Sequence, residues 1–296
     1  MRVFITGATG FIGTELVKKL VAAGHTVCGL SRSDAGAEQL QAAGAQVQRG
    51  DLKDLDSLRR GANGADAVVN LAFNHDDMNK FAESGADERA AIVALGEALK
   101  PGKLLVVTSG TGLASGGLGH LRLESDPPVS YLPRNPEDTA RTVAEKGLRV
   151  AIVRLPQVHD TRKQGLVPYL TETARQKGVS AYVGEGANRW AAAPLANVAE
   201  LYHRVVEQTT PGVTVYHAVQ EEGVSLRNIA ETIGKGLKVP VRSISEKEVA
   251  DHFGWLAHFA ALDMPASSEW TRRTLNWDPT GPGLIADLSA MDYQAG

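Results

Sequence analysis

Near its start the chain reads Arg2-Val3-Phe4-Ile5-Thr6-Gly7-Ala8-Thr9-Gly10-Phe11-Ile12-Gly13. Residues 2–6 form an apolar run typical of a buried strand, and residues 12–23 carry apolar side chains at helical spacing. In a Gly-x-x-Gly-x-x-Gly turn between such elements, the first glycine permits a tight bend and the second lets the backbone approach a pyrophosphate. The third lets the helix pack closely on the sheet. Because the helix N-terminus also offers free N–H groups to phosphate, this stretch predicts a dinucleotide-binding turn.

Outward from the turn, short apolar runs alternate with amphipathic segments through residue 155. The expected strands are residues 2–6, 26–30, 45–48, 66–71, 103–108 and 150–155, and the expected helices are 12–23, 35–43, 55–61, 87–100 and 136–146. Alternation of helices with continuously apolar strands is typical of a parallel sheet covered on both faces. The pattern predicts the α/β class, with a doubly wound parallel-sheet Rossmann fold.

After Pro156 the rhythm changes. Helices are expected at 166–177, at 194–208 and from Ser225 onward, with strands at 214–219 and 241–244. No linker or fixed-period repeat separates the two halves. We therefore expect a Rossmann dinucleotide-binding domain over residues 1–155 and a smaller, mixed α/β substrate-binding region over 156–296 that packs on it.

Composition excludes several classes of protein. With 43% hydrophobic and 22% charged residues, the 296-residue chain is typical of globular proteins and not of disordered ones. Its 31 basic and 34 acidic side chains argue against a broad nucleic-acid-binding surface. One cysteine, Cys28, allows no intrachain disulfide and no cysteine metal cluster. Since no signal-peptide layout and no apolar run of about 20 residues occurs, we expect a cytoplasmic protein with a small-molecule substrate, contacting neither nucleic acid nor membrane.

The sequence resembles the short-chain dehydrogenase/reductase superfamily, in its atypical or extended branch with the NAD-dependent epimerases and dehydratases. The matching segments of the first half occur in the family's order: Gly7 to Gly13, Gly50-Asp51-Leu52, Asn70-Leu71-Ala72, Thr108-Ser109 and Arg154-Leu155-Pro156. Residues 184–190, Val198-Ala199 and 225–230 resemble the substrate region of epimerase-like members. The resemblance covers nearly the whole chain, and it implies the fold and a nicotinamide cofactor.

The end of the second expected strand bears on which cofactor is used. An NAD-binding unit carries an acidic residue there to hold the ribose hydroxyls. This chain has Ser31-Arg32-Ser33, with no carboxylate until Asp34. Arg32 can pair with a 2′-phosphate and the serines can donate to it, which favours NADP(H) over NAD(H). The alternative is that Arg32 is a solvated loop residue.

The resemblance also implies the remaining cofactor contacts. Asp51 and Leu52 would flank the adenine, and Asp51 could at the same time be a helix N-cap. Leu71, Ala72 and Phe73 would line the path to the nicotinamide ribose. The full set of expected cofactor-binding residues is Gly7, Thr9, Gly10, Phe11, Ile12, Gly13, Ser31, Arg32, Ser33, Asp51, Leu52, Leu71, Ala72, Phe73, Thr108 and Pro156.

The catalytic pattern of the resembled family is incomplete. Its reductases use a Ser or Thr at the end of the fifth strand, which Thr108-Ser109 matches, followed by a Tyr with a Lys four residues on. None of the six tyrosines, at positions 131, 169, 182, 202, 216 and 293, is followed by such a lysine. Ser109 is expected to bind the substrate oxygen. The proton donor is either Tyr131, with Arg134 one helical turn away, or His159 beside Asp160 at the end of the sixth strand. A third interpretation is a chain that binds the dinucleotide without turnover.

Two further features of the sequence bear on the substrate site and on the oligomeric state. Aromatic and polar residues gather in the second half, where they could line a pocket or form an aromatic core: Trp190, His252, Trp255, His258 and Phe259. Trp190 matches a family position near substrate. The apolar face of helix 87–100 could form a homodimer, or pack on its own sheet.

We predict an NADP(H)-dependent oxidoreductase that reduces a carbonyl or related group on a small organic substrate. The alternatives are a non-redox epimerase, dehydratase or isomerase, and an NADP(H)-sensing protein.

Overall fold

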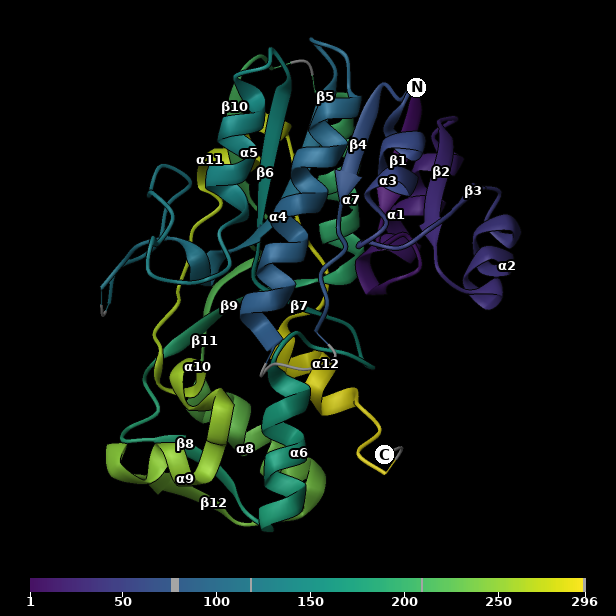
Figure 1. The fold of residues 1–296 in the computed structure, drawn as a ribbon. Helices are drawn as coiled ribbons and strands as arrows, with labels where there is room; N and C mark the ends of the chain where they lie inside the picture. Colours follow the sequence, from purple (N-terminus) through teal and green to yellow (C-terminus); the bar gives the residue numbers. More distant parts are fainter. Residues whose placement is uncertain (76–79, 118, 209, 295–296) are drawn as a thin grey trace.

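The computed structural model describes residues 1–75, 80–117, 119–208 and 210–294. Its central sheet has seven parallel strands in the order β10-β6-β5-β4-β1-β2-β3 (Figure 1). The strands are β1 (Arg2–Thr6), β2 (Thr26–Ser31), β3 (Gln46–Arg49), β4 (Ala67–Asn70), β5 (Leu104–Gly110), β6 (Arg149–Leu155) and β10 (Val213–His217). The central strands β1, β4, β5 and β6 are buried on both faces, which explains their nearly continuous apolar sequences, whereas the edge strands β3 and β10 are only partly buried. The predicted Rossmann-type α/β class is confirmed.

Helices cover both faces of this sheet. They are α1 (Phe11–Ala22), α2 (Asp34–Ala42), α3 (Leu55–Ala62), α4 (Phe81–Ala98), α5 (Pro136–Ala144) and α7 (Leu195–Glu207). Leu16 of α1 and Leu201 of α7 belong to the apolar cluster on one face. Leu58 of α3, Leu95 of α4 and Val143 of α5 belong to the cluster on the other, where α4 and α5 cross the front of the sheet in Figure 1. The apolar face of α4 is therefore covered by its own sheet, while a homodimer stays a prediction.

The elements expected for the first half are all present, with ends that differ by a few residues. The largest difference is α4, which begins at Phe81 instead of Asp87. The sheet has one strand more than the six expected, because β10 returns from the second half and pairs with β6. Periodicity marks such a segment as a strand but does not say which sheet it joins. The division of the chain at residue 155 stays a prediction.

The second region consists of small sheets and helices. Its strands are β7 (Gln157–His159), β8 (Ser180–Val183), β9 (Arg189–Pro194), β11 (Glu221–Ser225) and β12 (Val241–Ile244), paired as β11-β9-β7 and β12-β8. Its helices are α6 (Val167–Lys177), α8 (Leu226–Leu237), α9 (Val249–Phe253), α10 (Ala257–Ala261), α11 (Glu269–Leu275) and α12 (Leu284–Ala290). Short 3-10 turns occur at Thr111–Leu113, Glu246–Glu248 and Gly254–Leu256. Strands β7, β8, β9 and β11 were not expected, because runs of three to six residues give little periodic signal.

The parallel sheet directs all seven strand ends to one edge. Strand β1 starts at the labelled N-terminus at the top of Figure 1, so the strands end toward the second region below. Ligands of such sheets bind outside the carboxyl ends of the strands. None of the helices in the described ranges combines the length and apolar character that a membrane span requires.

Candidate active site

The glycine turn has the close backbone contacts that its sequence predicts. Gly7 has φ +67°, and its carbonyl accepts from the Gly10 N–H at 2.9 Å. A Cβ on Gly13 would lie 2.1 Å from the Gly7 carbonyl oxygen, and one on Gly7 would lie 2.9 Å from the Ala72 nitrogen. The turn, the start of α1 and the segment after β4 are thus packed backbone to backbone. A Cβ on Gly10, by contrast, would meet only the Gly7 carbonyl oxygen within 4 Å among the described residues, at 3.1 Å, so the turn is open to close approach of a pyrophosphate at this glycine.

The first turn of α1 keeps its N–H groups available. The helix starts at Phe11, with extended Gly10 as its N-cap and no side-chain cap hydrogen bond within the described residues. The N–H groups of Phe11, Ile12 and Gly13 are those that an α-helix leaves without an intrahelical partner. With no acidic side chain in the first turn, this end presents its positive dipole without a competing carboxylate.

A buried polar group lies beside the turn, at the end of β4. The Thr6 hydroxyl donates to Asn70 Oδ1 at 2.6 Å and accepts from the Ala72 N–H at 3.3 Å. Asn70 is 1% exposed, and its Nδ2 has no hydrogen-bond partner among the described residues. An unpaired buried donor is costly, so a ligand that accepts from it would be favoured here. The expected residues Leu71 and Ala72 follow directly.

At the end of β2 the structure brings together three of the expected cofactor residues. Ser31 is buried and donates from Oγ to the Ser33 carbonyl at 3.0 Å, while Ser33 caps α2 by accepting from the Gly36 N–H at 3.1 Å. A Cβ on Gly36 would lie 2.5 Å from Ser31 Oγ and 3.2 Å from Thr9 Cγ2. Strand β2, helix α2 and the glycine turn therefore meet at one point.

Two arginines flank that point. The Arg32 side chain is 74% exposed, with Nε 3.8 Å from Asp51 Oδ2. Arg49, at the end of β3, donates to the Ser33 carbonyl and to Asp34 Oδ1, the latter at 2.8 Å. Sequence reasoning missed Arg49, although its position at a strand end next to Gly50-Asp51 was a usable signal.

The alternative role of Asp51 as a helix N-cap is wrong. Asp54 caps α3, because its Oδ1 accepts from the Ser57 N–H at 3.1 Å. Asp51 instead accepts from the N–H of Lys53 and lies near Arg32, while Leu52 packs on the second apolar cluster.

The side chains of Phe73 and Arg134 stack on each other beyond the end of β4. The Arg134 guanidinium lies 4.1 Å from the centre of the Phe73 ring. It donates to both carboxylate oxygens of Glu88, at 2.8 and 2.7 Å, and Glu88 is 2% exposed. The expected helical relation between Tyr131 and Arg134 is wrong, because α5 begins only at Pro136. Tyr131 lies on a loop and is 70% exposed.

The hydroxyls of Thr108 and Ser109, near the end of β5, both have hydrogen-bond partners. Thr108 Oγ1 lies 2.7 Å from the hydroxyl of Tyr202, whose pKa is raised by its burial in α7. Ser109 Oγ donates to Glu137 Oε1 at 2.8 Å, and the same carboxylate accepts two hydrogen bonds from Arg154, each at 2.8 Å. Arg154 and Glu137 are fully buried. The Ser109 proton is thus committed to a buried ion pair that sequence reasoning did not foresee.

His159 has a carboxylate partner from the far end of the chain. Its Nδ1 lies 2.7 Å from Asp287 Oδ2, and the two side chains are 0% and 8% exposed. The carboxylate favours the tautomer with the proton on Nδ1, which leaves Nε2 as the second functional nitrogen. Nε2 is buried and has no hydrogen-bond partner among the described residues. Asp160 instead accepts from Arg162 and Lys163 of its own loop, and Pro156 is buried between β6 and β7.

The aromatic residues of the second half do not line one common surface. Trp190 is fully buried on β9, among apolar residues of the second region, and donates from Nε1 to the Phe259 carbonyl at 3.2 Å. Trp255 is 41% exposed and contacts the ring of Tyr169. His258 lies on the surface. The indole of Trp190 therefore occupies the apolar core of the second region.

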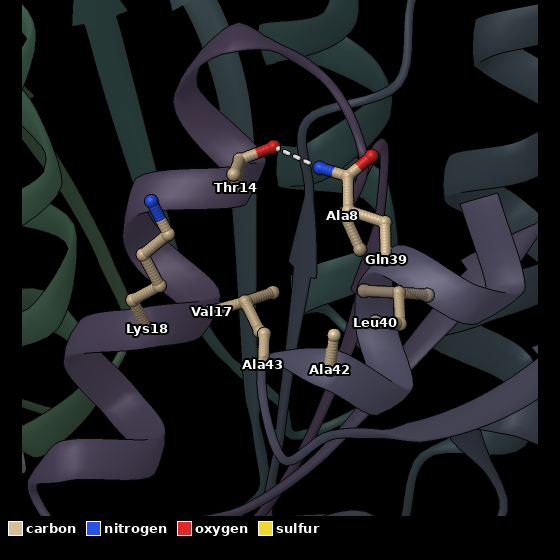
Figure 2. Close-up of a pocket in the computed structure, with 8 residues that line it drawn as sticks. All are labelled: Ala8, Thr14, Val17, Lys18, Gln39, Leu40, Ala42 and Ala43. Carbon is tan, nitrogen blue, oxygen red and sulfur yellow. Dashed lines mark hydrogen bonds between the residues drawn. The ribbon is translucent and has the colours of Figure 1, made fainter. Parts of the chain in front are cut away.

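Two cavities lie beside elements of the candidate site, one next to the glycine turn and one next to the segment that follows His159. One of about 290 Å³ lies between α1 and α2, where Gln39 donates to Thr14 Oγ1 at 2.9 Å (Figure 2). Its walls include Ala8 of the glycine turn. The other, of about 550 Å³, lies between residues 161–164, α6 and residues 291–292. Gln164, one of its lining residues, is the β-bridge partner of His159.

Comparison with known proteins agrees with this geometry. A family described as NAD(P)H-binding matches residues 7–187. An uncharacterized protein of Schizosaccharomyces pombe is 42% identical over 99% of this chain and 100% of its own length. A ketoreductase of Stigmatella aurantiaca, named for a farnesyl dihydroquinoline oxide substrate, is 25% identical over 90% of this chain and 84% of its own. The UDP-glucose 4-epimerase of Thermus thermophilus, solved with NAD, is 18% identical and has the same fold, with a TM-score of 0.75 over 100% of this chain and 99% of its own.

Proposed function

The chain belongs to the NAD(P)H-binding family, and on that premise we propose that it is an NADP(H)-dependent oxidoreductase that reduces a carbonyl on a small organic substrate. The observation that carries the proposal is the buried His159–Asp287 pair. Nε2 of His159 has no hydrogen-bond partner among the described residues. His159 ends β7, which follows β6 directly in the chain, and so comes after the carboxyl edge of the sheet, the edge at which the glycine turn follows β1. The ketoreductase named above adds support for the reaction class.

Each part of the proposed cofactor site has a physical task. The N–H groups at the start of α1 would bind the pyrophosphate, and Asn70 Nδ2 would donate to an acceptor on the cofactor. Leu71, Ala72 and Phe73 would line the path to the nicotinamide ribose. A bound nicotinamide supplies the hydride of the reduction.

The preference for NADP(H) is supported by charge at the end of β2. Arg32 is exposed there and can reach a 2′-phosphate. The carboxylate closest in sequence, Asp34, is already paired with Arg49 at 2.8 Å. With Asp34 paired to Arg49, the edge would offer to a phosphate the guanidinium of Arg32, which lies 3.8 Å from Asp51, and the exposed hydroxyl of Ser33. An NAD-binding site would offer a free carboxylate there.

The proton would come from His159. Reduction of a carbonyl adds hydride to carbon and a proton to oxygen, and a protonated imidazole can deliver that proton from Nε2. Asp287, 2.7 Å from Nδ1, would hold the ring in place with Nε2 free to act. Because His159 is 0% exposed, the proposal requires neighbouring side chains to move before substrate reaches Nε2. Ser109 would donate a hydrogen bond to the substrate oxygen only after its hydroxyl breaks the hydrogen bond to Glu137 Oε1.

One experiment tests the reaction. Purified protein is mixed with NADPH and a panel of aldehydes and ketones, and absorbance of the reduced cofactor is followed. Oxidation that survives Tyr131→Phe and is lost in both His159→Asn and Asp287→Asn supports the proposal. Oxidation that survives the His159 and Asp287 variants but not Tyr131→Phe would transfer the proton role to Tyr131. Product without net change in the cofactor would indicate an epimerase, dehydratase or isomerase.

A second candidate function is an NADP(H)-binding sensor without turnover. It is supported by the burial of His159 and by the commitment of the Ser109 proton to Glu137. Tight NADPH binding with no consumption across the panel would select it over the reductase.

The cofactor preference has its own test. Arg32→Asp is expected to weaken NADPH binding far more than NADH binding, because it places a negative charge beside the 2′-phosphate. Arg273→Asp on α11 is the matched control, since its side chain is 70% exposed against 74% for Arg32. Equal losses for the two cofactors in Arg32→Asp would contradict the assignment.

A further inference from the structure

Two histidines and a glutamate converge where the α1–β2 turn meets the end of α7. The group is His25, His203 and Glu207, whose ligand atoms all lie within 4.8 Å of one another. Glu207 Oε1 is 3.5 Å from His25 Nε2 and 3.4 Å from His203 Nε2. His25 directly precedes β2, so the group lies at the start of the strands, opposite the edge that carries the glycine turn and His159.

The imidazole nitrogens that face the carboxylate lack hydrogen bonds. His25 Nε2 and His203 Nε2 are both buried, and neither has a hydrogen-bond partner among the described residues. The His25 side chain is 8% exposed and that of His203 is 20% exposed, so bulk water does not readily replace the missing partners. Buried unpaired nitrogens are costly to a fold, and imidazole nitrogens and a carboxylate oxygen are ligand types that zinc takes, so a cation between them would be favoured.

The backbone holds the three residues in place without a metal. His203 and Glu207 are four residues apart on α7 and so share one helix face. His25 follows Gly24, which has φ +82°, and its N–H donates to the Leu20 carbonyl at 3.0 Å. His25 Nδ1 lies 3.5 Å from the Met1 amino nitrogen, which leaves Nε2 as the nitrogen facing Glu207.

Neighbouring charges leave Glu207 available. Glu200 is occupied by Lys19 at 3.0 Å and by Arg204 at 2.8 Å, and lies 3.8 Å from His203 Nδ1. Glu200 is therefore committed to Lys19 and Arg204 and does not compete with Glu207 for His203. Glu207, 51% exposed, is the carboxylate that faces both imidazoles and opens to solvent.

We propose that His25, His203 and Glu207 bind one divalent transition-metal ion of the zinc class. Imidazole and carboxylate ligands suit Zn²⁺, which takes four ligands at about 2.0–2.2 Å and tolerates water as the fourth. A tetrahedron of that size has edges of about 3.3 Å, close to the two carboxylate–imidazole distances of 3.4 and 3.5 Å. The ligand atoms of the two histidines lie within 4.8 Å of each other, so a bound ion would draw them together. The ion would tie the α1–β2 turn to α7, so its role is structural.

Calorimetric titration of the chelator-treated full chain with ZnCl₂ tests the site. We expect one Zn²⁺ per chain and a raised thermal midpoint. Removal of a ligand in His203→Ala or Glu207→Gln should weaken binding by more than the roughly 10–100-fold lost with an outer partner. The control is His258→Ala, a histidine on the surface, which should bind as the wild type does.

Glu207→Gln keeps the test valid if His203→Ala fails to fold, because Glu207 is half exposed and its amide replacement is nearly isosteric. Absence of stoichiometric Zn²⁺ binding to the wild type would overturn the proposal. Unchanged affinity in Glu207→Gln would overturn it as well, and so would a loss of affinity in His258→Ala as large as that in Glu207→Gln.

Discussion

Replacement of Gly13 by alanine is the most direct test of the contact between α1 and the glycine turn. The new Cβ would lie 2.1 Å from the Gly7 carbonyl oxygen and 2.8 Å from Ala8 Cα. Both neighbours are backbone atoms, so no side-chain rotation relieves the overlap. Ordinary contact requires about 3.5 Å, and the start of α1 must therefore move by more than about 1 Å.

The effect on cofactor binding should exceed the effect on stability. Overpacking costs about 1–3 kcal/mol, and alanine recovers about 1 kcal/mol over glycine in a helix. The net loss in the free energy of unfolding is therefore about 0–2 kcal/mol. Displaced N–H groups lose charge-assisted hydrogen bonds worth about 1.5–3 kcal/mol each. Two such losses weaken binding by more than about 100-fold.

The assay measures the dissociation constant for NADPH by fluorescence and the free energy of unfolding in urea. Gly24→Ala is the control, because a Cβ there would meet no atom of the described residues within 4 Å, at φ +82°. Its left-handed backbone costs about 1–2 kcal/mol with alanine, so stability should fall while affinity is kept. NADPH affinity in Gly13→Ala within tenfold of the wild type would refute the reasoning.

Three further predictions concern residues around the site. Glu137→Gln should lower the free energy of unfolding by about 3–5 kcal/mol, because it leaves the fully buried Arg154 without its carboxylate; Glu97→Gln, on the surface, should cost no more than about 1 kcal/mol, and similar losses in urea would contradict the prediction. Arg49→Ala should free the Asp34 carboxylate and lower the ratio of NADPH to NADH affinity, measured by fluorescence; an unchanged ratio would count against a role for Arg49. Burial lowers the pKa of His217, so the unfolded chain binds a proton that the folded chain excludes. The stability contributed by His217 is therefore full above about pH 6.5 and is lost as the pH falls below it. Urea unfolding at about pH 7.5 and 5 should show a smaller difference in His217→Gln than in the wild type, and an equal difference would assign the effect elsewhere.

What the sequence predicts well here is local. The glycine turn with its flanking strand and helix depends on residues close in the chain, whose spacing is visible as a pattern. The unexpected short strands β7 and β9 become stable through pairing with each other, which no run of three to six residues reveals.

The partners of the candidate catalytic residues were not predictable in this way. Asp287 meets His159 across 128 positions, and Glu137 meets Ser109 across 28. Neither carboxylate has a spacing that distinguishes it from a solvated one, because only the folded chain brings these positions together. The spacing of Arg134 from Tyr131 predicts a contact between these two residues. In the structure the Arg134 guanidinium instead donates to Glu88 and lies over the ring of Phe73.

The return of β10 to the first sheet has a consequence for biosynthesis. Until residues 213–217 leave the ribosome, β6 has no neighbour on its outer side and presents a free row of backbone groups. An exposed strand edge in a nascent chain is a template for association with other chains. A fragment that stops at residue 155 would keep that edge open permanently, so folding yield should depend on synthesis continuing past His217.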